Sequence, residues 1–102
     1  MAKEKLTKKH IGVCGVDAGM LMIVDPCYVV DRPIGKMDWG EFLKLSGMQL
    51  PNGVWPEHGY VRDPVRSTAL GVVVHTRYGD GEYPVIGYFD SEGRIAKIEI
   101  KF

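Results

Sequence analysis

The chain begins with two short apolar runs that predict a pair of β-strands. Residues 11–16 and 20–24 are rich in β-branched and long aliphatic side chains, and the Val-Asp-Ala-Gly sequence at 16–19 is typical of a tight turn. The second run is apolar on both faces, which indicates a central, well-covered strand. An Asp-Pro pair then ends it, because proline has no N–H to donate to a neighbouring strand. We therefore predict a hairpin, followed by extended chain at 27–30.

A single short helix is predicted in the middle of the chain. The residues at 31–35 include proline and glycine and break the preceding strand. Asp38 has the position of a helix N-cap, Glu41 stands three residues later as its capping-box partner, and Gly47 provides the C-terminal stop. Residues 48–66 follow without a clean period, and loops of this length in compact domains are usually functional. We expect this segment to be irregular and to act as a lid.

The last third of the chain has the clearest β pattern. Residues 70–77 and 82–89 are strongly β, and the Asp-Gly turn between them, at 78–81, is a strong hairpin signal. A second tight turn at 90–93 leads into residues 94–102, where apolar and charged side chains alternate. These three segments predict an antiparallel meander.

The predicted elements form one α+β domain: a mainly antiparallel five-stranded sheet, or a small barrel, with one short helix. We place this domain at residues 10–102, after a basic N-terminal tail at residues 1–9. The lysines of the tail are Lys3, Lys5, Lys8 and Lys9.

Composition narrows the class of protein. The 102 residues carry thirteen basic and thirteen acidic side chains, so the formal net charge is zero. Because nucleic-acid binders depend on a basic surface, sequence-specific nucleic-acid binding is disfavoured. The chain has no apolar run of about 18 residues and no signal-peptide pattern, so we expect a cytoplasmic protein without membrane spans. Cys14 and Cys27 are expected to be reduced, buried or half-buried thiols, because the predicted hairpin holds them too far apart for a disulfide.

Two blocks of the sequence carry a resemblance. The first contains VDxG at 16–19 and IVDPCY at 23–28, and the second contains GDGxYPV at 79–85, GRI at 93–95 and a final phenylalanine. As a set they resemble a group of short uncharacterised proteins from bacteria and their phages. They are also similar to the C-terminal part of a larger domain-of-unknown-function family. The resemblance implies a shared architecture and a phage-encoded protein, and it brings no catalytic residue with it.

Three carboxylates raise the question of a metal-dependent reaction. Asp17, Asp25 and Asp80 would hold Mg²⁺ or Ca²⁺, or act as acid and base, if they met at one end of the sheet. Turn formation explains all three without a ligand and is the favoured interpretation. The three histidines and two cysteines lack the spacing of a zinc site, and Cys27 has no nucleophile motif around it. We therefore expect no metal and no catalytic residue.

A pocket for an anionic molecule is the functional hypothesis that these residues support best. The backbone N–H groups of the glycine-rich turn at 79–81 would form an anion-binding nest, and arginines at both C-terminal turns would bind phosphate. Exposed aromatic rings would stack on a base. The candidate binding residues are Arg77, Tyr78, Gly79, Gly81, Arg94, Trp39, Trp55 and Tyr60. The alternative, in which these residues only pack and cap, stays open.

These observations predict a small non-enzymatic binding protein without a cofactor. We expect a homo-oligomer that sequesters an anionic small molecule, such as a nucleotide-derived immune signal, or that binds a host protein. One alternative is a small metal-dependent hydrolase that uses Asp17, Asp25 and Asp80. The other is a structural or immunity-type protein that acts through protein contacts alone.

Overall fold

The structure is a computed structural model that describes residues 5–49, 53 and 55–102. The described residues contain six strands, two α-helices and one 3-10 turn. In chain order these elements are β1 (Thr7–Val16), β2 (Met20–Val24), the 3-10 turn (Pro26–Tyr28), α1 (Pro33–Lys36), α2 (Trp39–Ser46), β3 (His58–Arg62), β4 (Ala69–His75), β5 (Gly81–Phe89) and β6 (Ile95–Ile100). The fold is therefore α+β, with mostly antiparallel strands.

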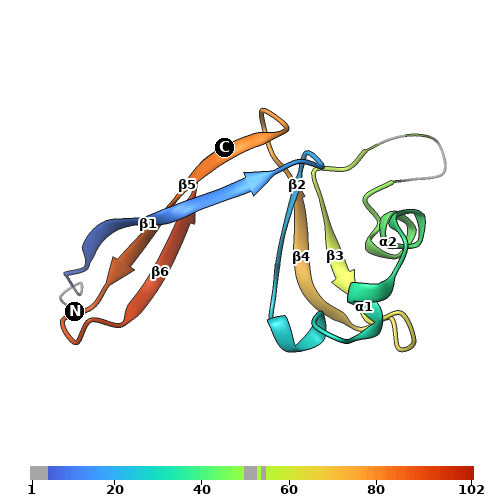
Figure 1. Ribbon diagram of the computed structural model, residues 1–102, viewed down its shortest axis with the longest axis horizontal. Coiled ribbons are helices and arrows are strands. Elements are labelled where there is room, and N and C mark those ends of the chain that lie inside the picture. The colour runs from blue at the N-terminus through green and yellow to red at the C-terminus, as the bar shows by residue number, and fades with distance from the viewer. Residues whose placement is uncertain (1–4, 50–52, 54) are drawn as a thin grey trace.

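The strands form two separate three-stranded sheets. One sheet has the order β1-β5-β6 and the other has the order β2-β4-β3, and every pairing is antiparallel. The chain runs from β1 into β2 and from β4 into β5 (Figure 1). The continuous segment β1–β2 therefore pairs with the continuous segment β4–β5 twice, as β1 with β5 in one sheet and as β2 with β4 in the other. We call the sheet β2-β4-β3 with its helices the body, the sheet β1-β5-β6 the arm, and residues 17–19 with 76–80 the junction.

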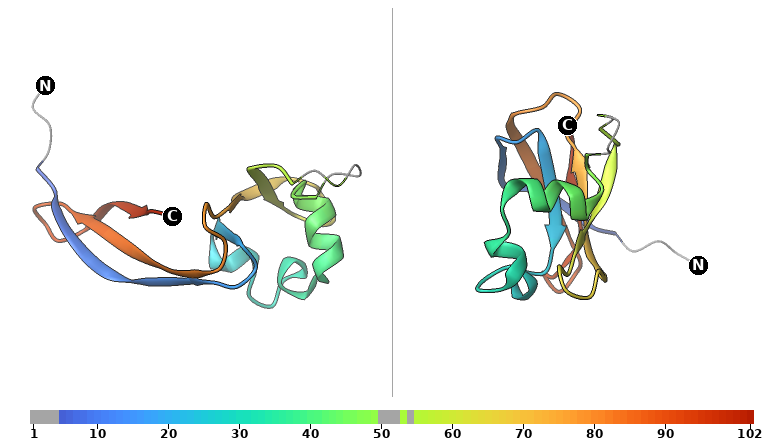
Figure 2. Two further views of the ribbon diagram at one scale, coloured as in Figure 1. Left: turned by 90° about the horizontal axis from the view of Figure 1, so that it is seen from above. Right: turned by 90° about the vertical axis from the view of Figure 1, so that its right-hand side faces the viewer.

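The arm projects from the body and makes the molecule elongated (Figure 2). The principal extents are 47 × 30 × 28 Å and the radius of gyration is 16.1 Å. A compact domain of about 100 residues has a radius of gyration of about 13 Å. The excess reflects the sheet β1-β5-β6, on which no second layer of the described residues lies.

The hydrophobic core lies in the body, where the helices pack on one face of the sheet β2-β4-β3. Its buried side chains are Ile34, Leu43, Met48, Val61 and Val73. Met48 is fully buried and comes directly after α2, so the end of this helix anchors the core. In the arm, by contrast, the buried side chains Val16 and Tyr83 both lie near the junction.

The predicted central helix is confirmed together with both of its caps. The Asp38 carboxylate accepts a hydrogen bond from the Glu41 N–H at 2.9 Å, and Gly47 ends α2 in the left-handed conformation with φ of 77°. Next to this end, β3 approaches so closely that a Cβ on Gly59 would collide with the Ser46 carbonyl oxygen. Glycine at position 59 is therefore what lets α2 pack on the sheet.

Both predicted hairpins that flank the junction are wrong. β1 pairs with β5 and not with β2, so Cys14 lies opposite Tyr83. β4 pairs with β2 and β3 and not with β5, so the predicted C-terminal meander reduces to the β5–β6 hairpin. The turn-like sequences at 16–19 and 78–81 form the junction instead, because each lets its chain pass from one sheet into the other. The five-stranded sheet and the closed barrel are wrong for the same reason.

Three local predictions are also corrected. The 48–66 segment is not irregular throughout, because it contains β3. Residues 27–30 are not extended: the 3-10 turn begins at Pro26, and α1 follows in the segment expected to be a break. β2 is an edge strand rather than a central one, and Met22 and Ile23 are 42% and 53% exposed.

The N-terminal lysines divide between two regions. β1 begins at Thr7, so Lys8 and Lys9 belong to a strand, while Lys3 lies outside the described residues.

Both cysteines are free thiols, as predicted; Cys14 is half-buried and Cys27 is exposed, which corrects the expectation of a covered thiol at position 27. Within the described residues, neither helix has the length or the apolar run needed to span a membrane.

Candidate functional site

The body contains an apolar pocket between β2 and the two helices. Its volume is about 270 Å³, and residues of β2, α1 and α2 line it. The side chains that define its character are Met20, Met22, Ile34, Met37, Trp39 and Phe42. Pockets that bury small ligands begin at about 300 Å³, and a dry cavity of about 150 Å³ already holds a benzene ring. This pocket is therefore large enough for one or two rings.

Aromatic and sulfur-containing side chains give the pocket its chemistry. The Trp39 and Phe42 rings stack with their centroids 5.6 Å apart and an interplanar angle of 27°. Trp39 is nevertheless 54% exposed, so its indole is free to cover a bound group. The methionines add flexible, polarisable thioethers that adapt to ligands of different shape. The pocket thus favours an apolar or aromatic group over an ion.

The sequence motifs VDxG and GDGxY meet at the junction. The Gly19 N–H donates to the Asp80 carboxylate at 2.8 Å, and the Gly19 carbonyl accepts from the Thr76 N–H at 2.9 Å. The hydroxyls of Thr76 and Tyr83 both donate to the Gly79 carbonyl, at 2.6 and 2.7 Å. The pocket reaches this region, because Ala18 belongs to its lining. These bonds hold the loops in place and leave Asp80 occupied as an acceptor.

A second hollow, with a volume of about 430 Å³, lies between the 3-10 turn and the β3–β4 loop. Its lining is mixed and includes Cys27, Tyr28, Arg32 and Arg66. Desolvation raises the pKa of the Cys27 thiol, and the neighbouring Asp25 carboxylate raises it further through a hydrogen bond and charge repulsion. A raised pKa lowers the fraction of reactive thiolate. Cys27 is therefore poorly suited to nucleophilic catalysis.

The residues predicted to bind an anion are spread over four regions. Arg77, Tyr78, Gly79 and Gly81 lie at the junction, and Trp39 lines the apolar pocket. The Trp55 ring makes an edge contact with His75, at 5.9 Å between ring centroids. The Tyr60 ring lies beside two side chains of its own strand, β3. Its centroid is 5.7 Å from the centroid of the His58 ring and 5.3 Å from the guanidinium carbon of Arg62. The four residues at 77–81 are neighbours in the sequence itself, and the structure does not gather all eight residues at one site.

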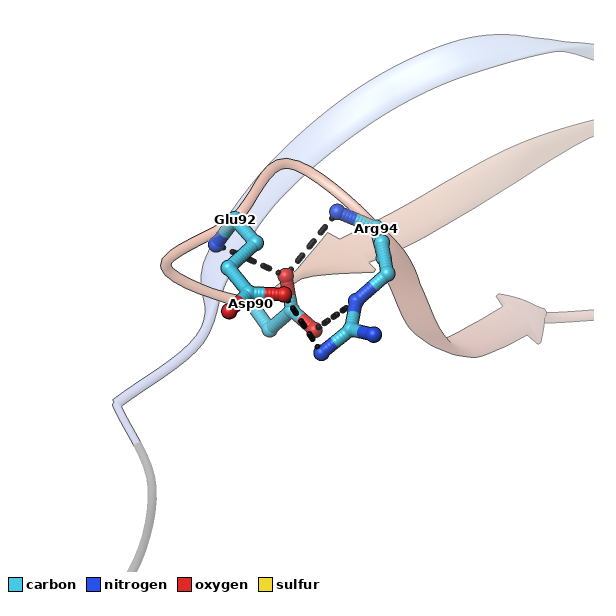
Figure 3. Close-up of polar contacts among 3 residues, drawn as sticks. All are labelled: Asp90, Glu92 and Arg94. Carbon is cyan, nitrogen blue, oxygen red and sulfur yellow. Dashed lines mark hydrogen bonds and ion pairs between the residues drawn. The ribbon is translucent and has the colours of Figure 1, made fainter.

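Arg94 lies at the outer end of the arm, where it forms ion pairs with two neighbouring carboxylates. It belongs to the turn between β5 and β6, where Nε lies 3.1 Å from Asp90 Oδ2 and Nη2 lies 2.8 Å from Glu92 Oε2 (Figure 3). The Asp90 carboxylate also accepts the backbone N–H groups of Glu92 and Arg94, each at 2.9 Å. The Arg94 N–H and guanidinium, with the Glu92 N–H, hold the pKa of Asp90 below its usual range. Arg94 therefore closes its own turn.

The three candidate metal-binding carboxylates do not form one cluster. Asp17 and Asp80 lie at the junction, whereas Asp25 follows the far end of β2 and caps the 3-10 turn by accepting the Cys27 N–H at 2.9 Å. Among the described residues, no group of three or more His, Cys, Asp or Glu side chains has the arrangement of a metal site.

Most of the residues that line the apolar pocket were not predicted from the sequence. Trp39 was a candidate, but the three methionines were not, because the two of β2 are far in the sequence from Met37, which follows α1. The available signal was the apolar character of β2: on the face that Met20, Met22 and Val24 share, Met20 and Val24 pack against the core while Met22 stays partly exposed in the pocket. Comparison of the chain with protein-family models, curated proteins and solved structures finds no match.

Proposed function

We propose that this protein is a cytoplasmic, non-enzymatic binding protein that holds an apolar or aromatic group of a small molecule in the pocket beside β2. The observation that carries the proposal is the pocket itself: about 270 Å³, lined by methionine, aliphatic and aromatic side chains, with the stacked Trp39–Phe42 pair at its wall. Burial of apolar surface drives such binding, and adaptable methionines allow related ligands to be accepted.

The methionines supply both the probe and its internal control. Met20, Met22 and Met37 line the pocket, whereas Met48 is buried in the core and does not line it. We would label the methionine methyl groups with ¹³C and titrate the protein with indole and with 1-hexanol. We expect saturable shifts of the three pocket methyl signals and an unchanged Met48 signal. Equal shifts of all four signals, or none, would refute the proposal.

A pocket-filling variant separates specific binding from general adhesion. Ala18 is exposed and lines the pocket, so Ala18→Phe places a ring in the pocket without changing a core residue. Val30 is 66% exposed and does not belong to the lining, so Val30→Phe adds the same ring elsewhere. Indole binding should be lost in Ala18→Phe and kept in Val30→Phe.

An anionic ligand, such as a nucleotide-derived signal, is the second candidate. The observation that favours it is the exposed pair at the junction, where the Arg77 guanidinium lies 5.5 Å from the Tyr78 ring centroid and Tyr78 is 74% exposed. Such a pair offers charge to a phosphate and a flat surface to a base. Calorimetry with mono-, di- and cyclic nucleotides should give heat that Arg77→Ala abolishes and Arg94→Ala preserves. No heat from the wild-type protein would eliminate this candidate.

A further inference from the structure

The arm has one apolar face that nothing in the described chain covers. Side chains that pair directly in an antiparallel sheet project on the same side. Val85 pairs with Ile100 and Gly87 with Ile98, so these side chains share one face, and Phe89, two residues after Gly87 on β5, lies on it too. Ile11 joins them, because a Cβ on Gly87 would lie 3.2 Å from its Cγ2 atom. Lys9 pairs with Gly87 and extends over the Phe89 ring on this same side, with 5.2 Å between its Nζ and the ring centroid. We call the aliphatic and aromatic part of this surface, made of Ile11, Val85, Phe89, Ile98 and Ile100, the apolar face of the arm.

The opposite face of the arm carries polar and charged side chains. Lys97 lies over the Tyr88 ring, with 4.0 Å between Nζ and the ring centroid, and the Tyr88 hydroxyl donates to Glu99 at 3.3 Å. On the apolar face, Ile11 and Ile98 are each about half exposed, at 46% and 51%. A sheet with one apolar face requires a second layer. Within the described residues, neither helix nor the other sheet lies on the arm (Figures 1 and 2).

We infer that the second layer is the apolar face of another copy of this chain, so that the protein is a homodimer through its arms. This inference goes beyond the proposed function, because the arm and the pocket are different surfaces. In an isologous pair each copy presents the same patch, so one self-complementary face suffices. Two sheets pack face to face at a separation of about 10 Å, which the interdigitating aliphatic side chains would fill.

The charges along the arm favour one orientation of the two copies. Lys5, Lys8 and Lys9 lie at the outer end, whereas at the junction end three carboxylates, Asp17, Asp80 and Glu82, outnumber the cations Arg77 and Lys101. The acidic groups of the outer end, Asp90 and Glu92, already share Arg94. If the arms stack antiparallel, the basic end of each copy lies over the acidic end of the other. A parallel stack would oppose like charges, so the two-fold axis runs across the arms.

The size of the arm is compatible with a modest dimer interface. Nine residues of β5 span about 30 Å and three strands span about 14 Å, so the face has a flat footprint of about 400 Å². Side chains make its accessible surface larger than this footprint. A standard interface buries about 800 Å² from each partner. The apolar face therefore provides the centre of the interface, and the charged ends provide the rim.

Sedimentation velocity on the wild-type protein and two matched variants tests this inference. Ile98→Asp places a charge on the apolar face, and Val13→Asp places the same charge on the other face, at a position that is 58% exposed. We expect a dimer for the wild type and for Val13→Asp, and a monomer for Ile98→Asp. A monomeric wild type, or equal dissociation of both variants, would overturn the inference.

A second measurement does not depend on the folding of a variant. In an equimolar mixture of ¹³C-labelled and unlabelled wild-type protein, isotope-filtered NMR detects contacts between copies. We expect intermolecular contacts to the methyl groups of Ile11 and Ile98. A dimer whose intermolecular contacts lie outside the apolar face would refute the inference just as a monomer would.

Discussion

The backbone N–H of Gly19 donates a 2.8 Å hydrogen bond to the carboxylate of Asp80, 61 residues further along the chain. This bond joins the two loops of the junction at the place where both chain segments leave the body and enter the arm. The Gly19 carbonyl accepts a second hydrogen bond across the junction, from the Thr76 N–H at 2.9 Å. The position of the arm relative to the body therefore depends on these hydrogen bonds and on the few side chains buried near the junction, Val16, Thr76 and Tyr83.

Loss of the Asp80 carboxylate should weaken the junction specifically. We expect Asp80→Ala to lower the free energy of unfolding by about 1 kcal/mol, because one exposed hydrogen bond is lost. The Gly19 amide should exchange with solvent faster in this variant. Asp17→Ala is the matched control, since this carboxylate bonds to none of the described residues. Equal effects of the two substitutions, measured by urea unfolding and amide exchange, would contradict the role of Asp80.

The close approach of β3 to α2 predicts a strong effect of one added methyl group. A Cβ on Gly59 would meet the Ser46 carbonyl oxygen and lie 2.9 Å from the Met48 sulfur, so Gly59→Ala should cost about 1–3 kcal/mol of stability. The same change at Gly15, where nothing lies within 4 Å, should have little effect. Thermal unfolding of both variants checks this difference. A Gly59→Ala variant as stable as Gly15→Ala would show that β3 can move away.

The turn at the outer end of the arm should lose stability in acid. Because the pKa of Asp90 is lower in the folded protein than in the unfolded chain, its ionised form stabilises the turn above about pH 4. This contribution should disappear as the pH falls through the lowered pKa. The amide signals of Glu92 and Arg94, followed by NMR, should shift together with a midpoint below about 3.9. In Asp90→Asn this titration should be absent, and a wild-type midpoint above that value would be inconsistent with the hydrogen bonds.

Cys27 should react slowly with alkylating reagents although it is exposed. Its raised pKa reduces the thiolate fraction at neutral pH, so in a Cys14→Ser background the rate should reach its midpoint above about pH 8.5. Asp25→Asn keeps an acceptor for the Cys27 N–H but removes the negative charge, and it should move the midpoint down. Iodoacetamide kinetics against pH measure both values. An Asp25→Asn midpoint equal to or above that of the wild type would disprove the influence of Asp25.

Elements whose signals are local were predicted from the sequence. The capping residues Asp38 and Gly47 act within one turn of α2, and the Asp90–Gly93 turn closes β5 on β6 with bonds among its own residues. Such interactions depend on neighbours in the chain, so the residue types are enough to identify them. The sequence also led to the correct prediction that both cysteines are free thiols, although the hairpin between β1 and β2 on which this prediction rested does not form.

The partners of each strand, and with them the pocket and the arm, were decided by tertiary structure. A turn-like sequence permits a hairpin, but the loops at 17–19 and 76–80 bond to each other more fully than either closes on itself. Pairing β1 with β5 and β2 with β4 is a choice between distant segments, which turn composition does not encode. Met20, Met37 and Trp39 become neighbours only after that choice is made. The sequence alone thus specified the caps of α2, the turn at 90–93 and the apolar strand segments, and the long-range pairing of these strands specified the surfaces available for binding.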